Sequence, residues 1–282
     1  MILHPHQAGL LPTLDPHWRQ RLWVAGLVLC LPVIGWPALL GYRAGLVRHL
    51  RHDHATLLPA WRGRFAEHLG HGLRAVAVIF GHLAPLYIAL GVLAWRRGYG
   101  PEPGAVAVAS VMLAFPIFAT LSFPLACLHL TLRPEPILPT NACVVALGLW
   151  ALLVFLVPAG FLAVSRTGRY RDAFAWRWTL PFVWRNLGTY TRAWWYSGLM
   201  SLAGHLALPL APWGVAWCYL AIVALFNEVL WHDEGRPTSG WMARVVAAPR
   251  PAGQPIVDAD GARVRTLDLG VFTAVLPGRP GP

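Results

Sequence analysis

Histidine offers the widest choice of chemistry in this chain, because a neutral imidazole binds metal ions and its proton equilibrium lies near neutral pH. Five of the 12 histidines follow the first long apolar segment: His49, His52, His54, His68 and His71. Such a group could bind zinc or respond to pH, but the His-Glu-x-x-His spacing of a helical zinc site is absent. We therefore expect solvated interfacial histidines and no metal, with His49, His52, His68 and His71 as the weak candidates for ligands.

Three other histidines, His82, His129 and His205, fall inside apolar segments, where a polar ring needs a partner. Each could be an axial ligand of a tetrapyrrole, or could form a hydrogen bond within the protein, which is the commoner outcome. No cofactor is therefore predicted, and a tetrapyrrole remains the alternative. Paired acids at catalytic spacing, a nucleophile elbow and a phosphate-binding loop are all missing from the sequence, so we expect no catalysis.

The segments that must position these residues are long and uncharged. Of the 282 residues 56% are hydrophobic and 12% are charged, which indicates a membrane protein. Uncharged stretches run over Leu22 to Tyr42, Ala75 to Trp95, Pro103 to Leu132, Pro136 to Ser165 and Ala193 to Asn227. Prolines divide the last into Tyr190 to Leu208 and Trp213 to Trp231. The sequence predicts an all-α, multi-pass transmembrane bundle of about six membrane segments, the first kinked or broken near Pro32, Gly35 and Pro37.

All 23 basic residues are arginines, and 12 of them fill two loops, Arg43 to Arg74 and Arg166 to Arg192. The positive-inside rule places both loops on the cytoplasmic side of a prokaryotic inner membrane. Three apolar segments separate the loops, so one segment must enter and leave on the same face. We expect Pro103 to Leu132 to form this re-entrant hairpin, bent near Phe115 and Pro116. The alternative, that one basic loop is external, stays open.

Both basic loops also carry aromatic residues. Trp61, Phe65, Leu69 and Leu73 recur at helical spacing, which predicts an amphipathic helix in the membrane interface. The expected contacts to anionic lipid headgroups or to protein partners are Trp61, Arg62, Arg64, Arg177, Trp178, Trp184, Arg185, Trp194 and Trp195. Tryptophan and arginine also mix in single-strand nucleic-acid sites, but this mixture is ordinary at membrane interfaces, so no nucleic acid is expected.

Composition divides the chain into three parts. Residues 1–20 are expected to be an N-terminal extension and residues 21–231 the transmembrane domain, with two related halves, 21–95 and 136–231. Each half contains a Gly/Tyr/Arg cluster, Gly41-Tyr42-Arg43 and Gly168-Arg169-Tyr170-Arg171, which we expect at the end of an apolar helix. Residues 232–282 are rich in proline and glycine and contain a predicted turn at Asp258 to Gly261 between two short strands.

Several short motifs resemble those of a prokaryotic polytopic membrane family of uncharacterised function, domain of unknown function 4013. They are Pro32-Val33-Ile34-Gly35, Gly41-Tyr42-Arg43, Leu58-Pro59-Ala60-Trp61, Gly72-Leu73-Arg74-Ala75, Arg169 to Phe174 and Arg185-Asn186. The resemblance covers roughly residues 21–231. It implies a polytopic helical domain with interfacial helices, and it brings no activity, cofactor or catalytic residue.

The sequence therefore favours a non-catalytic subunit that packs as an accessory or scaffold against other proteins of a membrane complex. The related halves and the proline-broken helices favour a small transporter as the alternative, with His82, Asn141 and His205 as polar candidates near the midplane. A pigment-binding or haem-binding subunit is the third interpretation.

Overall fold

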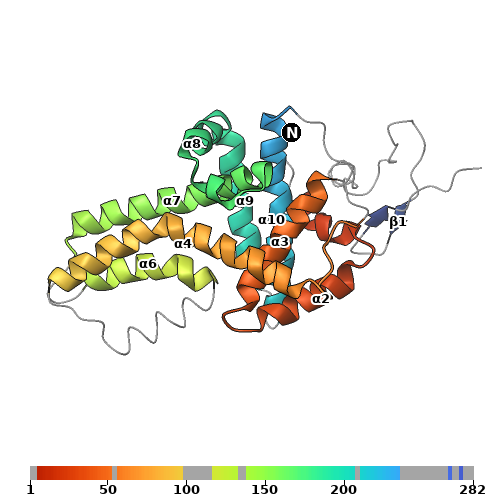
Figure 1. Ribbon diagram of the computed structural model, residues 1–282, viewed down its shortest axis with the longest axis horizontal. Helices are drawn as coiled ribbons and strands as arrows, with labels where there is room; N and C mark the ends of the chain where they lie inside the picture. Colours follow the sequence, from red (N-terminus) through yellow and green to blue (C-terminus); the bar gives the residue numbers. More distant parts are fainter. Residues whose placement is uncertain are drawn as a thin grey trace, which may run out of the picture.

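The computed structural model describes residues 5–52, 56–97, 116–132, 138–206, 210–235, 266–268 and 273–275. Within these ranges the chain is helical apart from one short hairpin (Figure 1). The helices are α1 (Pro5–Leu10), η1 (Leu11–Leu14), α2 (Trp18–Leu29), α3 (Gly35–Arg51), α4 (Phe65–Arg96), α6 (Pro116–Thr131), α7 (Thr140–Thr167), η2 (Tyr170–Phe174), α8 (Trp176–Arg185), α9 (Leu187–Leu206) and α10 (Ala211–Asp233). The predicted helical class is therefore confirmed.

The first apolar segment breaks between α2 and α3, as its prolines predict. Helix α2 ends at Leu29, α3 begins at Gly35, and Val33 between them takes a positive φ of 67°. A branched side chain rarely adopts this conformation, which reverses the chain direction sharply here. Leu22 to Tyr42 is consequently not a single crossing helix.

Helix α4 departs from the expected arrangement of an interfacial helix followed by a separate span. It is one helix of 32 residues that carries both the amphipathic stretch and the apolar stretch, with Pro85 inside it. Its first turns pack against α3 instead of lying alone at an interface. Both patterns have the same helical period, so the chain has no reason to break where one gives way to the other.

Three of the described helices are long and apolar enough to cross a membrane, namely α4, α7 and α10. Helix α6 has 16 residues and spans about 24 Å, less than the hydrocarbon core of about 30 Å. Pro124 lies within α6 and does not divide it. The described residues therefore support a membrane protein with three candidate spans, and the count of six is not reproduced.

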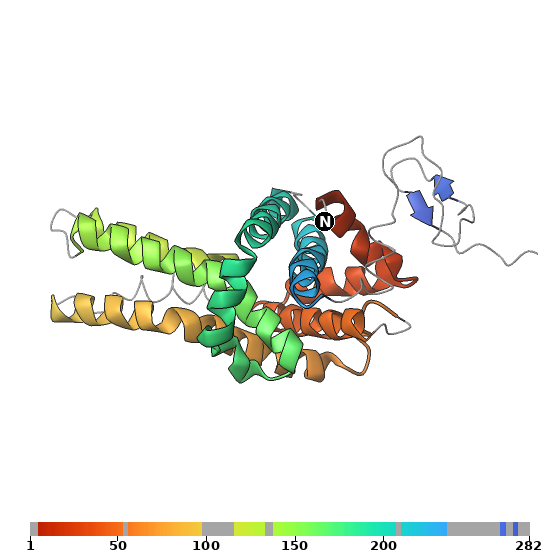
Figure 2. The ribbon, with the colours of Figure 1, turned by 90° about the horizontal axis from the view of Figure 1, so that it is seen from above.

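The C-terminal half of α4, helix α6 and the N-terminal half of α7 form a projecting arm, with α6 and α7 in contact and α4 beside them (Figures 1 and 2). Its small core comprises Phe123, Cys127, Leu138 and Cys143. The C-terminal ends of α4 and α6 and the start of α7 all reach the tip of the arm (Figure 1). The chain thus leaves α4 and ends α6 at the same tip, and the re-entrant hairpin stays a prediction. Most of its first half, including Phe115, lies outside the described residues.

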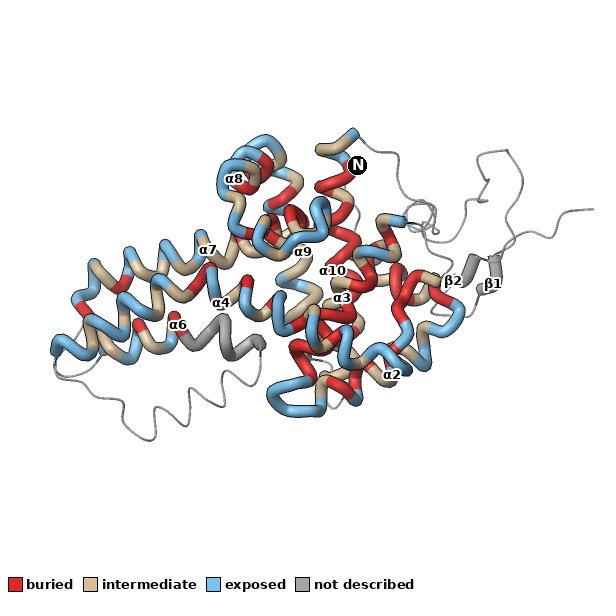
Figure 3. Tube along the Cα trace, viewed as in Figure 1, coloured by how far each residue is buried: buried red, intermediate tan, exposed pale blue. Residues whose placement is uncertain are grey.

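The rest of the molecule is a body built around α10, where the buried residues concentrate (Figure 3). Helix α10 packs against α9, α2 and α3, and it runs steeply across the direction of α4 and α7 (Figure 2). The N-terminal residues belong to this core: Ala8 and Leu11 are fully buried, and Trp217 donates a hydrogen bond to the Gly9 carbonyl at 2.9 Å. Residues of the predicted N-terminal extension thus pack against the predicted transmembrane domain.

The two basic segments meet at one end of the body. Glu234, just after α10, lies 3.5 Å from the Arg51 guanidinium at the end of α3 and 3.7 Å from that of Arg166 at the end of α7. The neighbouring Asp233 pairs with Arg185 at 3.2 Å. We call these five residues the charge clasp. It places arginines from both basic segments on the same side of the molecule.

The C-terminal region contains an antiparallel hairpin, with β1 (Thr266–Asp268) paired to β2 (Thr273–Val275) in the register Thr266 to Val275. The strands predicted on either side of Asp258 to Gly261 lie outside the described residues.

Candidate functional site

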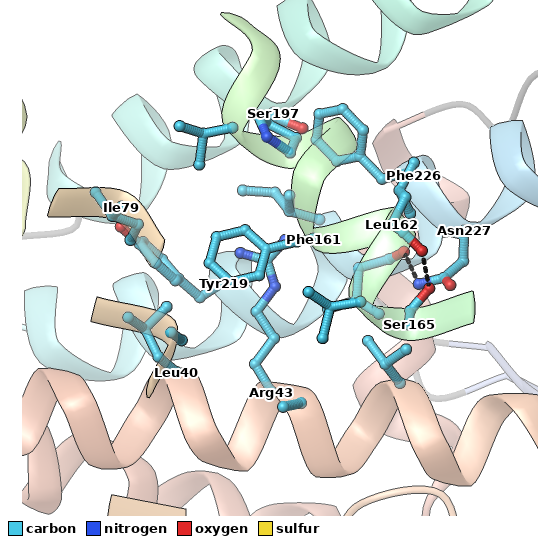
Figure 4. A pocket seen from close by; sticks show the side chains of 18 of the residues that line it. Leu40, Arg43, Ile79, Phe161, Leu162, Ser165, Ser197, Tyr219, Phe226 and Asn227 are labelled. Atoms are coloured by element: carbon cyan, nitrogen blue, oxygen red, sulfur yellow. Dashed lines mark hydrogen bonds between the residues drawn. The ribbon is translucent and has the colours of Figure 1, made fainter. Parts of the chain in front are cut away.

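A cavity of about 480 Å³ lies between α3, α4, α7, α9 and α10 (Figure 4). Apolar side chains form most of its wall. Its polar or ionisable lining residues are Arg43, Arg48, His71, Ser165, Tyr170, Ser197, Ser201, His205, Tyr219 and Asn227, with the indole of Trp36 and Trp194. Among the described residues that line it there is no aspartate or glutamate. The cavity therefore carries positive charge without an acidic side chain in its wall.

Arg43 is the central feature of this cavity. Its side chain extends from α3 toward Tyr219 and Phe161 (Figure 4), and its guanidinium carbon lies 6.0 Å from the centre of the Tyr219 ring. Within the described ranges the guanidinium forms neither an ion pair nor a hydrogen bond. A guanidinium has five N–H donors, so the arginine keeps its full capacity to bind an anion.

Two glycines at the crossing of α3 and α4 determine the direction in which Arg43 points. A Cβ atom on Gly41 would lie 1.7 Å from the His68 carbonyl oxygen, and one on Gly72 would lie 1.5 Å from that of Pro37. The backbones of α3 and α4 thus touch at a crossing that only glycine permits. Successive helical residues are 100° apart, so Arg43 lies nearly opposite Gly41 and faces α7 and α10.

Tyr42, between these two residues, fixes the rotation of α3 from a third side. Its ring stacks on Trp61 at 4.2 Å between centroids with an interplanar angle of 3°. The His68 ring meets both of them edge-on at 5.3 Å. This aromatic cluster is buried, so α3 cannot turn Arg43 out of the cavity without dismantling it.

The other polar groups in the wall mostly bond to the backbone of their own helix. His205 Nδ1 lies 2.6 Å from the Ser201 carbonyl oxygen, and the Asn227 amide donates to the Val223 oxygen at 2.8 Å. Ser165 Oγ donates to the Leu162 oxygen at 2.9 Å (Figure 4). Because a carbonyl can only accept, Nδ1 of His205 carries the proton. These groups are satisfied locally, in contrast to Arg43.

At the edge of the cavity, the Tyr170 hydroxyl lies 3.2 Å from Nδ1 of His71. Burial raises the pKa of Tyr170, and the positive charges of Arg48 and Arg74 oppose that rise. The phenol therefore stays protonated at neutral pH and donates to the imidazole. On the other side of the ring, the Glu67 carboxylate lies 3.9 Å from Nε2 of His71. The same carboxylate lies 3.3 Å from the Arg48 guanidinium.

The structure disperses the histidines that the sequence singles out. His82 is buried, stacks on Phe174 at 4.6 Å and contacts the Val78 carbonyl oxygen at 2.8 Å through Nδ1. His129 is exposed on α6, Asn141 is exposed at the start of α7, and of the transporter candidates only His205 lines the cavity.

The four weak metal candidates are likewise occupied by local contacts. His49 contacts the Thr56 carbonyl oxygen at 2.8 Å, and His68 contacts that of Ala60 at 3.0 Å. His52 is exposed, and His71 bonds to Tyr170. In the part of the chain that the structure describes, no three histidine, cysteine or acidic side chains form a group able to hold a metal ion.

The expected interfacial residues divide into three kinds. Trp61 is buried in the aromatic cluster, so it differs from the expectation and contacts protein, whereas Trp194 is half-buried and lines the cavity. Trp178 is half-buried beneath the Arg166 guanidinium at 5.6 Å. The exposed ones are Arg62, Arg64, Arg177, Trp184, Arg185 and Trp195. Of these, Arg185 pairs with Asp233 in the charge clasp, and the other five are exposed for contacts at a membrane surface.

Arg43 itself was missed, because it was counted with the arginines of a basic loop. That segment is largely helix: α3 continues to Arg51, and Gly41 to Arg43 lies in its middle. The second cluster does end a helix, since Gly168 follows α7 in the left-handed conformation. The sequence pattern that could have identified Arg43 is the pair Gly41 and Gly45. The pair gives α3 one face of small residues and leaves Arg43 on the opposite face.

A helical chain with three helices able to cross a membrane and a cavity between helices defines the class of this protein. Within that class, the chain belongs to the family described as Protein of unknown function (DUF4013), whose model matches residues 24–212. The match includes the Gly41 and Gly72 crossing and Arg43. No curated protein and no solved structure matches the chain.

Proposed function

We propose that this protein is a non-catalytic, multi-pass subunit of the prokaryotic inner membrane that acts as an accessory or scaffold for other membrane proteins. The arm carries this proposal. In both α4 and α7 only 17% of the most apolar stretch is buried by the protein itself, and the described arm core has four buried side chains. The arm therefore offers a long apolar surface to neighbouring helices.

Small residues on the arm favour a protein neighbour in addition to lipid. Gly148 on α7 and Gly91 on α4 are exposed, and a Cβ atom at either position would meet nothing within 4 Å. Helices associate in membranes mainly where small residues let backbones approach closely, as already happens at Gly41 and Gly72. Exposed Trp184 on α8, next to Arg185 of the charge clasp, and exposed Trp195 on α9 add aromatic surface.

Isolation of the full-length chain from native membranes in mild detergent, followed by mass spectrometry of the copurifying proteins, tests this function. A defined membrane protein should copurify with it in a fixed ratio. Gly148→Leu should remove that partner without changing the monomer, whereas Gly188→Leu, at another open and exposed glycine on α9, should retain it. A chain that purifies alone as a monomer contradicts the proposal.

The cavity favours a small transporter as a second candidate. It lies between packed helices, carries a cation, and is lined by α4, α7 and α10, the three candidate spans. Substrate sites of secondary transporters are built between helices in this way. Flux of a labelled substrate into proteoliposomes, abolished by blocking the cavity with Ser197→Trp, supports this function. Equal flux with the blocked variant would remove it.

A further inference from the structure

We propose that the cavity binds an amphipathic anion, in which a carboxylate or phosphate head pairs with Arg43 and an apolar tail lies along the helices. This inference goes beyond both proposed functions, because it names the class of ligand that the cavity binds. The same ligand would occupy the cavity as a permanent lipid of a scaffold or as the substrate of a transporter.

The charge of Arg43 is the first argument. Arg43 is half-buried, with mainly apolar side chains around it, and ionisable groups in such a place in helical membrane proteins normally pair with a group of opposite charge. The acids of the neighbouring helices already pair elsewhere: Glu67 with Arg48, Asp233 with Arg185, and Glu234 with Arg51 and Arg166. Glu228 on α10 is not among the residues that line the cavity. The counter-charge for Arg43 is therefore expected from a ligand.

The position of Arg43 is the second argument. The Gly41 and Gly72 crossing and the stacked Tyr42 and Trp61 rings hold α3 in place from the opposite side. With the helix fixed, only the side-chain torsions of Arg43 have to be ordered when it binds an anion, and its planar donors match a carboxylate or phosphate. Arg48 adds a second guanidinium at the edge of the same cavity.

The wall of the cavity is the third argument, and it predicts the tail. Beyond Arg43 the surface consists mainly of apolar side chains, among them Leu40, Ile79, Val157, Phe161 and Phe226 (Figure 4). A volume of about 480 Å³ lies within the range of about 300–1,000 Å³ found for small-molecule sites. A small hydrophilic anion would leave this surface unfilled, whereas an amphiphile matches both parts.

Two sources supply this chemistry, a free fatty acid and a phospholipid, and ligands of equal tail length separate them. Full-length protein in a neutral detergent is titrated with oleate, oleoyl lysophosphatidate and oleyl alcohol, and binding is read from displacement of a fluorescent fatty acid. At least one anion should bind roughly tenfold or more tightly than oleyl alcohol. Preference for oleate assigns the site to a fatty acid, and preference for lysophosphatidate assigns it to a phospholipid.

Variants tie the preference to Arg43. Arg43→Met should bind both anions about tenfold more weakly and lose the preference over the alcohol, while Arg43→Lys should keep most of it. Arg192→Met, which removes an exposed arginine of α9 outside the cavity, should bind like the parent. If Arg43→Met does not fold, the anion-to-alcohol ratio of the parent protein decides. Two results overturn the proposal. The first is that the parent binds the anions and the alcohol equally well, and the second is that folded Arg43→Met binds the anions as tightly as the parent does.

Discussion

The arm and the body contain helices that are similarly apolar but differ in how much of their apolar surface the protein buries. In α10, at the centre of the body, 61% of the most apolar stretch is buried, against 17% in both α4 and α7. The exposed apolar side chains of the arm include Ile88, Val92, Val144, Val145, Leu149 and Leu152. Hydropathy alone therefore cannot separate a helix that faces its surroundings from one that forms the core.

Close backbone contact is what separates the two regions. The body is joined at glycines: Gly41 and Gly72 join α3 to α4, and Gly204 of α9 meets the Gly214 carbonyl of α10. In the arm Gly91 and Gly148 face open space. Packing of this kind drives helix association where water is absent, so the body forms a stable unit and the arm remains free to pack against other molecules.

The sharpest way to break this comparison is to place the same methyl group on two glycines of α4. Gly72→Ala forces a carbon into the Pro37 carbonyl, so it should destabilise the protein by roughly 3 kcal/mol. Gly91→Ala meets nothing and improves helix propensity, so it should be neutral or stabilising by up to about 1 kcal/mol. Thermal unfolding in detergent measures both changes, and equal effects would remove the distinction between the regions.

An arginine on each region tests whether the arm lies in lipid. Leu149 of α7 and Leu180 of α8 have matched exposure, 47% and 48%. Leu149→Arg should cost about 3 kcal/mol, the penalty for arginine near the middle of a membrane helix, and should lower the yield in the membrane fraction. Leu180→Arg, between Arg177 and Arg185 in sequence, should change stability by under about 0.5 kcal/mol. If Leu149→Arg changed neither the stability nor the yield in the membrane fraction, water and not lipid would surround the arm.

The ion pairs of the body sharpen the comparison at a smaller scale. Glu234→Gln removes the partner of Arg51 and Arg166 in the charge clasp, where the Glu234 side chain is only 14% exposed, and should cost about 2 kcal/mol. Glu67→Gln removes the partner of Arg48, where the Glu67 side chain is 42% exposed, and should cost at most about 1 kcal/mol. Unfolding at low and high salt measures both, and equal costs would show that burial does not strengthen the clasp.

The helical class and the break near Pro32 could be predicted from the sequence, because apolar run length and proline act locally. The continuity of α4 could not, since an amphipathic pattern and a fully apolar pattern share one helical period. The burial of Trp61, which lies in the segment between α3 and α4, depends on Tyr42 of α3, and nothing in the spacing around Trp61 identifies that partner.

The candidate site was harder to predict than the fold. Counting arginines gives the side of the membrane on which a segment belongs, but it does not distinguish an arginine in solvent from one in a cavity. Arg43 points into the cavity, whereas Arg48 lies at its edge and pairs with Glu67, and this difference depends on the face of α3 that Gly41 and Gly72 hold against α4. Neither glycine carries chemistry of its own, so a search for reactive residue types does not find them.

The charge clasp has a consequence for the order of events during synthesis. Asp233 ends α10 and Glu234 follows it, so both leave the ribosome after Arg51, Arg166 and Arg185. Domains begin to fold from the N-terminus while the chain is being made, so the earlier segments are synthesised before these two acids exist. In the proposed multi-pass subunit, the charge of the arginines would therefore act on the orientation of the chain before Asp233 and Glu234 neutralise part of it. The same arginines would then serve first as a topological signal and later as ion pairs that hold the finished arrangement.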